Sequence, residues 1–115
     1  MIRSLQVRGQ IPFHTGSGKN EIHVGSNRAR IIVDGGSNEI HVNGTITDIH
    51  FQATEQIQNI YDFDCGIIDI SALSNCADHT IATFDDGVEV SAGYELLRFH
   101  NTSIEIIEEC LKTSV

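Results

Sequence analysis

The stretch from residue 13 to residue 52 reads FHTGSGKNEIHVGSNRARIIVDGGSNEIHVNGTITDIHFQ and repeats itself every nine residues. A short strand-like motif recurs without slippage, at 13–16, 22–25, 31–34, 40–43 and 49–52. Turn-forming residues such as Gly16-Ser17-Gly18 fill the intervals. A fixed short period of this kind is typical of a solenoid.

Within each motif the apolar residues alternate with variable ones, which is the period of a strand. Ile22 and Val24 share one side, and His23 lies on the other. Because one strand cannot close a turn alone, one coil requires two strands and two turns, or about eighteen residues. The sequence therefore predicts an all-β fold, a short parallel β-roll whose two sheets face each other across a layer of Ile and Val.

Residues eighteen apart should then stack on adjacent rungs, at a spacing of about 4.8 Å. The expected outer neighbours are Glu21 with Glu39, His23 with His41, Arg30 with Asp48, and Ile32 between His14 and His50. Stacked histidines beside glutamates suit zinc. A repeat, however, copies its surface residues without selection for a ligand, and a flat sheet lacks the cavity of a catalytic metal site.

The period fails after residue 52, so we expect a β-roll in residues 1–59 and a capping segment in residues 60–115. An open coil end would expose unpaired strand edges, which makes a cap necessary. The cap should contain antiparallel strands at 60–64, 66–71, 80–84, 88–91 and 94–99. A C-terminal helix should follow over 103–111, with a capping box from Thr102 to Glu105.

Composition narrows the class of protein. The 115 residues carry a formal charge of −9 with seven Lys and Arg, which argues against a nucleic-acid-binding surface. No apolar run is long enough to span a membrane, and no signal peptide is evident. The three cysteines form no CxxC pair, which argues against a zinc knuckle or a disulfide framework and favours a reducing compartment.

The period and the segment that follows it resemble a known family. Nine-residue repeats with glycine-rich turns resemble the parallel β-roll of RTX (repeats-in-toxin) proteins, whose consensus is G-G-x-G-x-D-x-U-x. Directly afterwards, residues 61–73 read YDFDCGIIDISAL, similar to the DFD…IDLSAL stretch that opens the C-terminal domain of serralysin-like RTX proteins. Residues 101–107, NTSIEII, are similar to that domain's closing segment. The resemblance implies a secreted, calcium-binding module.

The family's calcium-binding Asp positions are altered here. With isoleucines at the U position, the Asp position is occupied by Asn20, Ala29, Asn38 and Thr47. Calcium gains affinity from ligand charge, so these neutral residues weaken any site. Asn20 above Asn38 could instead form an amide ladder without an ion. The remaining candidate calcium ligands are Asp34, Asn20, Asn38, Asp62, Asp64 and Asp69.

No residue set points to an enzyme. Cys65, Cys76 and Cys110 lack placeable His and Asp partners, and Gly16-Ser17-Gly18-Lys19 lacks the spacing of a phosphate loop. The sequence thus predicts a non-enzymatic RTX-like module with a structural or binding role and a protein partner. The alternative is a stand-alone acidic cytosolic inhibitor that blocks a basic or nucleic-acid-binding protein. We expect the RTX-like module to be secreted if the resemblance extends to function. We expect the inhibitor to be cytoplasmic if the free cysteines indicate its compartment.

Overall fold

The computed structural model describes residues 2–7, 12–25, 28–43, 46–52, 57–73, 76–93 and 95–113. These residues are mostly β, in agreement with the predicted class, and α1 (Ile104–Cys110) is the one α-helix among them. The strands are β1 (Ile2–Val7), β2 (Phe13–His14), β3 (Lys19–Val24), β4 (Ala29–Val33), β5 (Ser37–His41), β6 (Thr47–Phe51), β7 (Ile57–Tyr61), β8 (Ile68–Asp69), β9 (Thr80–Phe84), β10 (Gly87–Ala92), β11 (Glu95–His100) and β12 (Leu111–Lys112). A short 3-10 helix, η1 (Cys76–Asp78), precedes β9.

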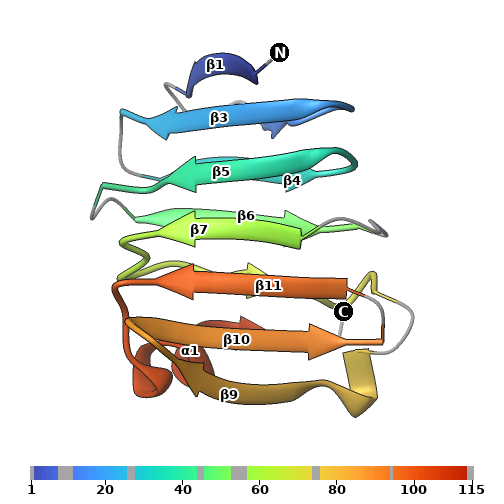
Figure 1. The fold of residues 1–115 in the computed structure, drawn as a ribbon, viewed down its shortest axis with the longest axis vertical. Coiled ribbons are helices and arrows are strands. Elements are labelled where there is room, and N and C mark those ends of the chain that lie inside the picture. The colour runs from blue at the N-terminus through green and yellow to red at the C-terminus, as the bar shows by residue number, and fades with distance from the viewer. Residues whose placement is uncertain are drawn as a thin grey trace.

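The strands form two sheets that face each other (Figure 1). The seven-stranded sheet has the order β1-β3-β5-β7-β11-β10-β9, and the five-stranded sheet has the order β12-β8-β6-β4-β2. In Figure 1, β4 and β6 lie behind β5 and β7, so the chain passes from one sheet to the other and back. This alternation follows from one strand per nine-residue motif, because successive motifs must occupy opposite sheets.

The predicted pairing of residues eighteen apart is confirmed in the repeat. Between β3 and β5, Ile22 pairs with Ile40 and His23 with His41, in parallel. Between β4 and β6, Arg30 pairs with Asp48 and Ile32 with His50, and His14 on β2 lies on the other side of Ile32. β1 joins the sheet one residue out of this frame, since Leu5 pairs with Ile22.

The core lies between the two sheets. It is lined by the alternating apolar positions of the repeat, and Ile22, Ile31, Ile40 and Ile49 are fully buried. Burial of each such side chain contributes roughly 1.5–3 kcal/mol. Phe51, Phe63 and Phe99 close the C-terminal half of the core, with edge contacts from Phe99 to the other two rings.

The parallel stack continues past residue 52, where the nine-residue period fails. β7 pairs with β5 so that Ile40 meets Ile60, twenty residues later, and β8 pairs with β6 so that Ile49 meets Ile68, nineteen residues later. The strand predicted at 60–64 lies three residues earlier, at Ile57–Tyr61, and it spans the expected change from repeat to capping segment at 59. One or two extra residues per coil hide these rungs from a search at fixed spacing.

The C-terminal segment adds both antiparallel and parallel pairs. β9, β10 and β11 form antiparallel hairpins, and β11 then lies parallel to β7. α1 lies behind β9 and β10 in Figure 1 and buries Ile107 against the core. Its N-cap is Ser103, whose Oγ accepts from the Ile106 amide, so the capping box predicted at Thr102 is wrong by one residue. No helix in the described ranges is long and apolar enough to cross a bilayer.

Candidate functional site

A ladder of buried side-chain amides occupies one edge of the stack, and it includes two predicted calcium ligands. Nδ2 of Asn20 donates to Oδ1 of Asn38 at 2.9 Å, and Nδ2 of Asn38 donates to Oε1 of Gln58 at 2.7 Å. Gln58 Nε2 in turn donates to the Gly36 carbonyl at 2.8 Å. All three side chains are at most 2 % exposed. We call Asn20, Asn38 and Gln58 the amide ladder.

The ladder satisfies its polar groups from within the protein. Asn20 also donates to the Thr15 carbonyl, and Asn38 donates to the Gly35 carbonyl. A buried amide that lacks partners costs about 1–3 kcal/mol, so a satisfied ladder removes a large penalty. The predicted rung-to-rung amide bond between Asn20 and Asn38 is therefore confirmed, and the Asn38 side-chain oxygen accepts an N–H donor in it.

The opposite edge of the stack is filled by small residues and backbone. Ala29 pairs with Thr47, and both are fully buried. Gly66 follows on the next rung with φ +128°, and a Cβ placed there would lie 1.9 Å from the Thr47 carbonyl oxygen. Only glycine fits this position, because the backbone of one rung presses on the next. Ala29 and Gly66 offer no side-chain oxygen at this edge.

Asp34, a further predicted ligand, is held in the turn after β4. Its Oδ1 accepts from the Gly16 amide at 2.8 Å, and its Oδ2 lies 3.0 Å from Nδ1 of His14. Partial burial opposes ionisation of this carboxyl, but the hydrogen bonds from Gly16 and His14 outweigh it and lower the pKa of Asp34. The carboxylate thus ties two successive coils together.

Asp62, Asp64 and Asp69 each have separate surroundings. Asp62 has φ +63° and accepts from Asn101 at 2.7 Å, while Asp64 is exposed. In the part of the chain that the structure describes, no group of three or more His, Cys, Asp or Glu side chains is arranged to hold a metal ion. The three aspartates predicted as a cluster are accordingly not brought together as one site.

Asp69 connects Ser71 and His50, an arrangement that sequence reasoning missed. The Ser71 hydroxyl donates to Oδ1 of Asp69 at 2.6 Å, and Nδ1 of His50 lies 2.9 Å from Oδ2. Burial opposes ionisation, but the hydrogen bonds from Ser71 and His50 outweigh it and lower the pKa of Asp69. Because the hydroxyl bonds to the carboxylate and not to the imidazole, this triplet does not activate Ser71 as a nucleophile.

A column of stacked rings crosses the outer face of the seven-stranded sheet. The centroids of His23 and His41 are 4.8 Å apart, those of His41 and Tyr61 are 4.7 Å apart, and those of Tyr61 and His100 are 4.5 Å apart. The planes are within 13° of parallel, so the rings present their edges to solvent. Phe84 completes the column from β9, edge-on to His100 at 5.3 Å.

Gly87 makes room for that last contact. It pairs with His100 on one side and with Phe84 on the other, so the column has no side chain at this rung. A Cβ at Gly87 would lie 1.9 Å from the Phe99 carbonyl oxygen. Phe84 therefore reaches across a glycine to the next ring, an arrangement known to stabilise glycine positions in sheets. We call His23, His41, Tyr61, His100 and Phe84 the ring column.

Carboxylates line the ring column. Oε1 of Glu21 lies 2.7 Å from Nε2 of His23, and Oδ1 of Asp86 lies 3.5 Å from Nδ1 of His100. Burial raises the pKa of Tyr61, and the negative charges of Glu39 and Asp86 raise it further. The tyrosine is therefore a neutral hydrogen-bonding group at ordinary pH.

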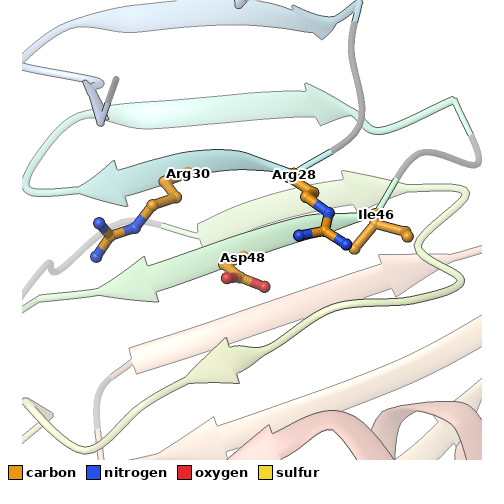
Figure 2. Close-up of a pocket in the computed structure, with 4 residues that line it drawn as sticks. All are labelled: Arg28, Arg30, Ile46 and Asp48. Carbon is orange, nitrogen blue, oxygen red and sulfur yellow. The ribbon is translucent and has the colours of Figure 1, made fainter. Parts of the chain in front are cut away.

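Figure 2 shows a shallow hollow on the outer side of the five-stranded sheet, lined by Arg28, Arg30, Ile46 and Asp48. The Arg28 amide donates to the Ile46 carbonyl at 2.6 Å, and Ile46 is 40 % exposed. The two arginines point in different directions, and Asp48 lies between them (Figure 2). Since Asp48 already supplies a negative charge, the hollow is a poor site for an anion.

Sequence reasoning missed Gln58, Tyr61, His100 and Phe84, although a signal was present for the first two. Residues 20–23, 38–41 and 58–61 share one order, amide, polar, isoleucine and ring. A search that allows two extra residues would have found the third copy. No protein-family model, curated protein or solved structure matches the chain.

Proposed function

We propose that this protein is a non-enzymatic RTX-like β-roll module with a binding role, which folds without calcium. The observation that supports this most is the amide ladder of Asn20, Asn38 and Gln58, because Asn20 and Asn38 stand where the RTX consensus has its calcium-binding Asp. In calcium-dependent rolls, carboxylates of neighbouring turns repel each other until the ion arrives. Neutral amides that bond to one another remove that repulsion.

Weak calcium binding remains part of the proposal, with Asp34 as its best ligand. Its carboxylate is ionised, partly exposed and adjacent to the carbonyl of Gly35 in a glycine-rich turn. A lone carboxylate with carbonyls corresponds to a weak site, because calcium takes six to eight oxygen ligands.

A second candidate function is an acidic inhibitor that binds a basic protein. The observation that favours it is the ring column with carboxylates beside it, on a chain of net charge −9. Aromatic side chains are enriched at the centres of protein interfaces, and complementary charge speeds association. Both functions give the protein a binding role, and they differ in whether calcium has any part.

Isothermal titration calorimetry with calcium tests the primary proposal. The protein is first freed of metal with chelator and then returned to chelator-free buffer. Titrated calcium should then give little heat, consistent with at most weak binding, and Asp34→Asn should remove that heat. Glu108→Gln, on the exposed side of α1, serves as a control of equal charge change. Tight uptake of several ions per chain, coupled to folding, would contradict a calcium-independent module.

A further inference from the structure

The ring column extends beyond the residues that the repeat copies. His23 and His41 occupy equivalent repeat positions, so repetition alone explains that pair. Tyr61 follows a two-residue insertion, His100 comes from β11, and Phe84 comes from an antiparallel strand. The repeat, β11 and β9 nevertheless all supply rings to one column on one face of the sheet.

The five-stranded sheet provides an internal comparison. Its equivalent column runs through His14, Ile32, His50 and Asp69, so no two histidines are neighbours. His14 and His50 each pair with a single aspartate. Repetition and charge pairing alone therefore produce a broken column, and the unbroken one on the seven-stranded sheet requires another explanation.

The ring column also has an acidic neighbour on the same face. Glu21 and Glu39 stand on adjacent strands, two residues before His23 and His41. The row then runs through Asn59 and Arg98 to Glu89 on β10. Glu39 is exposed, and within the described residues no ion pair is formed by it. The unpaired Glu39 carboxylate beside polar ring edges suits a cation that carries several hydrogen-bond donors in one plane.

One such cation is already bound within the chain. Nε of Arg98 lies 3.1 Å from Oε2 of Glu89, and its Cζ lies 5.8 Å from the centroid of the Phe84 ring. At this end of the face, a guanidinium contacts a carboxylate and an aromatic ring at the same time. Guanidinium groups are better suited to this double contact than ammonium groups, because they are planar and more weakly hydrated.

We propose that the outer face of the seven-stranded sheet docks an arginine-rich segment of a partner protein. The partner's guanidinium groups would pair with Glu39 and Glu21 and donate hydrogen bonds to the polar ring edges of His41 and Tyr61, whose faces are covered within the column. Within the chain, Arg98 likewise contacts a carboxylate, Glu89, and a ring, Phe84. The net charge of −9 attracts such a segment from a distance. This inference rests on the proposed binding role and names the chemistry of the partner.

A hexa-arginine peptide is the probe, titrated while amide and ring NMR signals are followed. Signals of His23, His41 and Tyr61 should shift in a saturable manner, whereas those of His14 and His50 on the other sheet should not. Hexa-lysine should bind more weakly, because an ammonium group lacks the planar fork of donors that can reach a carboxylate and a ring edge together. Equal shifts on both sheets, no shift, or equal affinity for hexa-lysine would overturn the inference.

Matched variants separate this site from general charge attraction. Glu21→Gln with Glu39→Gln should weaken hexa-arginine binding about fivefold, the effect of losing two exposed ion pairs. Glu108→Gln with Glu109→Gln makes the same charge change on α1, behind the sheet, and should alter affinity by less than about twofold because distant charges are screened. Equal losses in the two variants would contradict docking at this face.

Tyr61→Leu tests the part played by the rings. It should weaken hexa-arginine binding more than hexa-lysine binding, because leucine has no polar edge for the guanidinium donors, and a purely structural tyrosine would not produce this change in selectivity. If this variant fails to fold, the glutamate variants decide the question. A chain that folds in chelator but binds no hexa-arginine would overturn the docking surface and leave the proposed module intact.

Discussion

Asn38 is the central residue of the amide ladder, since it accepts from Asn20 and donates to Gln58. Its side chain is 1 % exposed, so both bonds form away from water. A carboxylate in its place could still accept from Asn20 but would face the Gln58 and Gly35 oxygens without a proton to donate. The identity of this one side chain therefore decides whether the edge of the stack requires a cation.

Asn38→Asp should lower the free energy of unfolding by roughly 3 kcal/mol, because it places an uncompensated charge in a buried network. Urea unfolding followed by circular dichroism measures this change. The control is Gln52→Glu, the same amide-to-carboxylate change at an exposed residue after β6, which should change the value by no more than about 0.5 kcal/mol. Comparable losses in the two variants would show that the ladder contributes little to stability.

β4 shows how the fold depends on the two faces of one strand. Ile31 points into the core and is fully buried, whereas Ile32 lies on the outer face between His14 and His50 and is half-buried. The two residues are chemically identical neighbours, so the difference between them reports the register of the strand alone.

Ile31→Asp should abolish the cooperative thermal transition, because a carboxylate in the apolar layer has no partner. Ile32→Asp should stay folded, with a midpoint within about 5 °C of the unchanged protein, because its side chain reaches solvent. Differential scanning calorimetry on both variants makes the comparison. The same midpoint for both would mean that the strand does not separate an inner from an outer face.

The predictability of these elements depends on the spacing of their residues. The cross-strand pairs of the repeat, such as Glu21 with Glu39 and Ile32 with His50, could be predicted because the nine-residue period alone specifies them. Gln58 and Tyr61 were missed because insertions break the period, although side-chain order is kept. His100 and Phe84 could not be found, since only the fold of the hairpins brings β11 and β9 beside the repeat.

The spacing of apolar residues predicted the C-terminal helix, but its N-cap is Ser103, one residue after the predicted Thr102. Thr102 and Ser103 are both good N-cap residues, and the position of Glu105 favoured the first. Packing decides between them, because Ser103 as N-cap leaves Ile107 buried against the core. Likewise, the sequence identified the candidate ligands Asp34, Asp62, Asp64 and Asp69, but only the structure shows that Asp34, Asp62 and Asp69 each have their own partners and that Asp64 is exposed.

At the scale of the whole molecule, the two sheets enclose a continuous apolar layer that extends from the repeat into the C-terminal segment. The amide ladder lines one edge of this layer, and Ala29, Thr47 and Gly66 line the other. Neither edge places carboxylates opposite one another. We therefore expect the apolar layer and the amide bonds to be sufficient for folding.

Thermal melts in chelator and in calcium test this claim most directly. We predict a cooperative transition in chelator. Calcium should raise the free energy of unfolding by less than the roughly 2.7 kcal/mol expected when a ligand is in hundredfold excess over its Kd. Magnesium at the same concentration is the control for ionic strength. A chain that is disordered in chelator and melts cooperatively only in calcium would contradict the account.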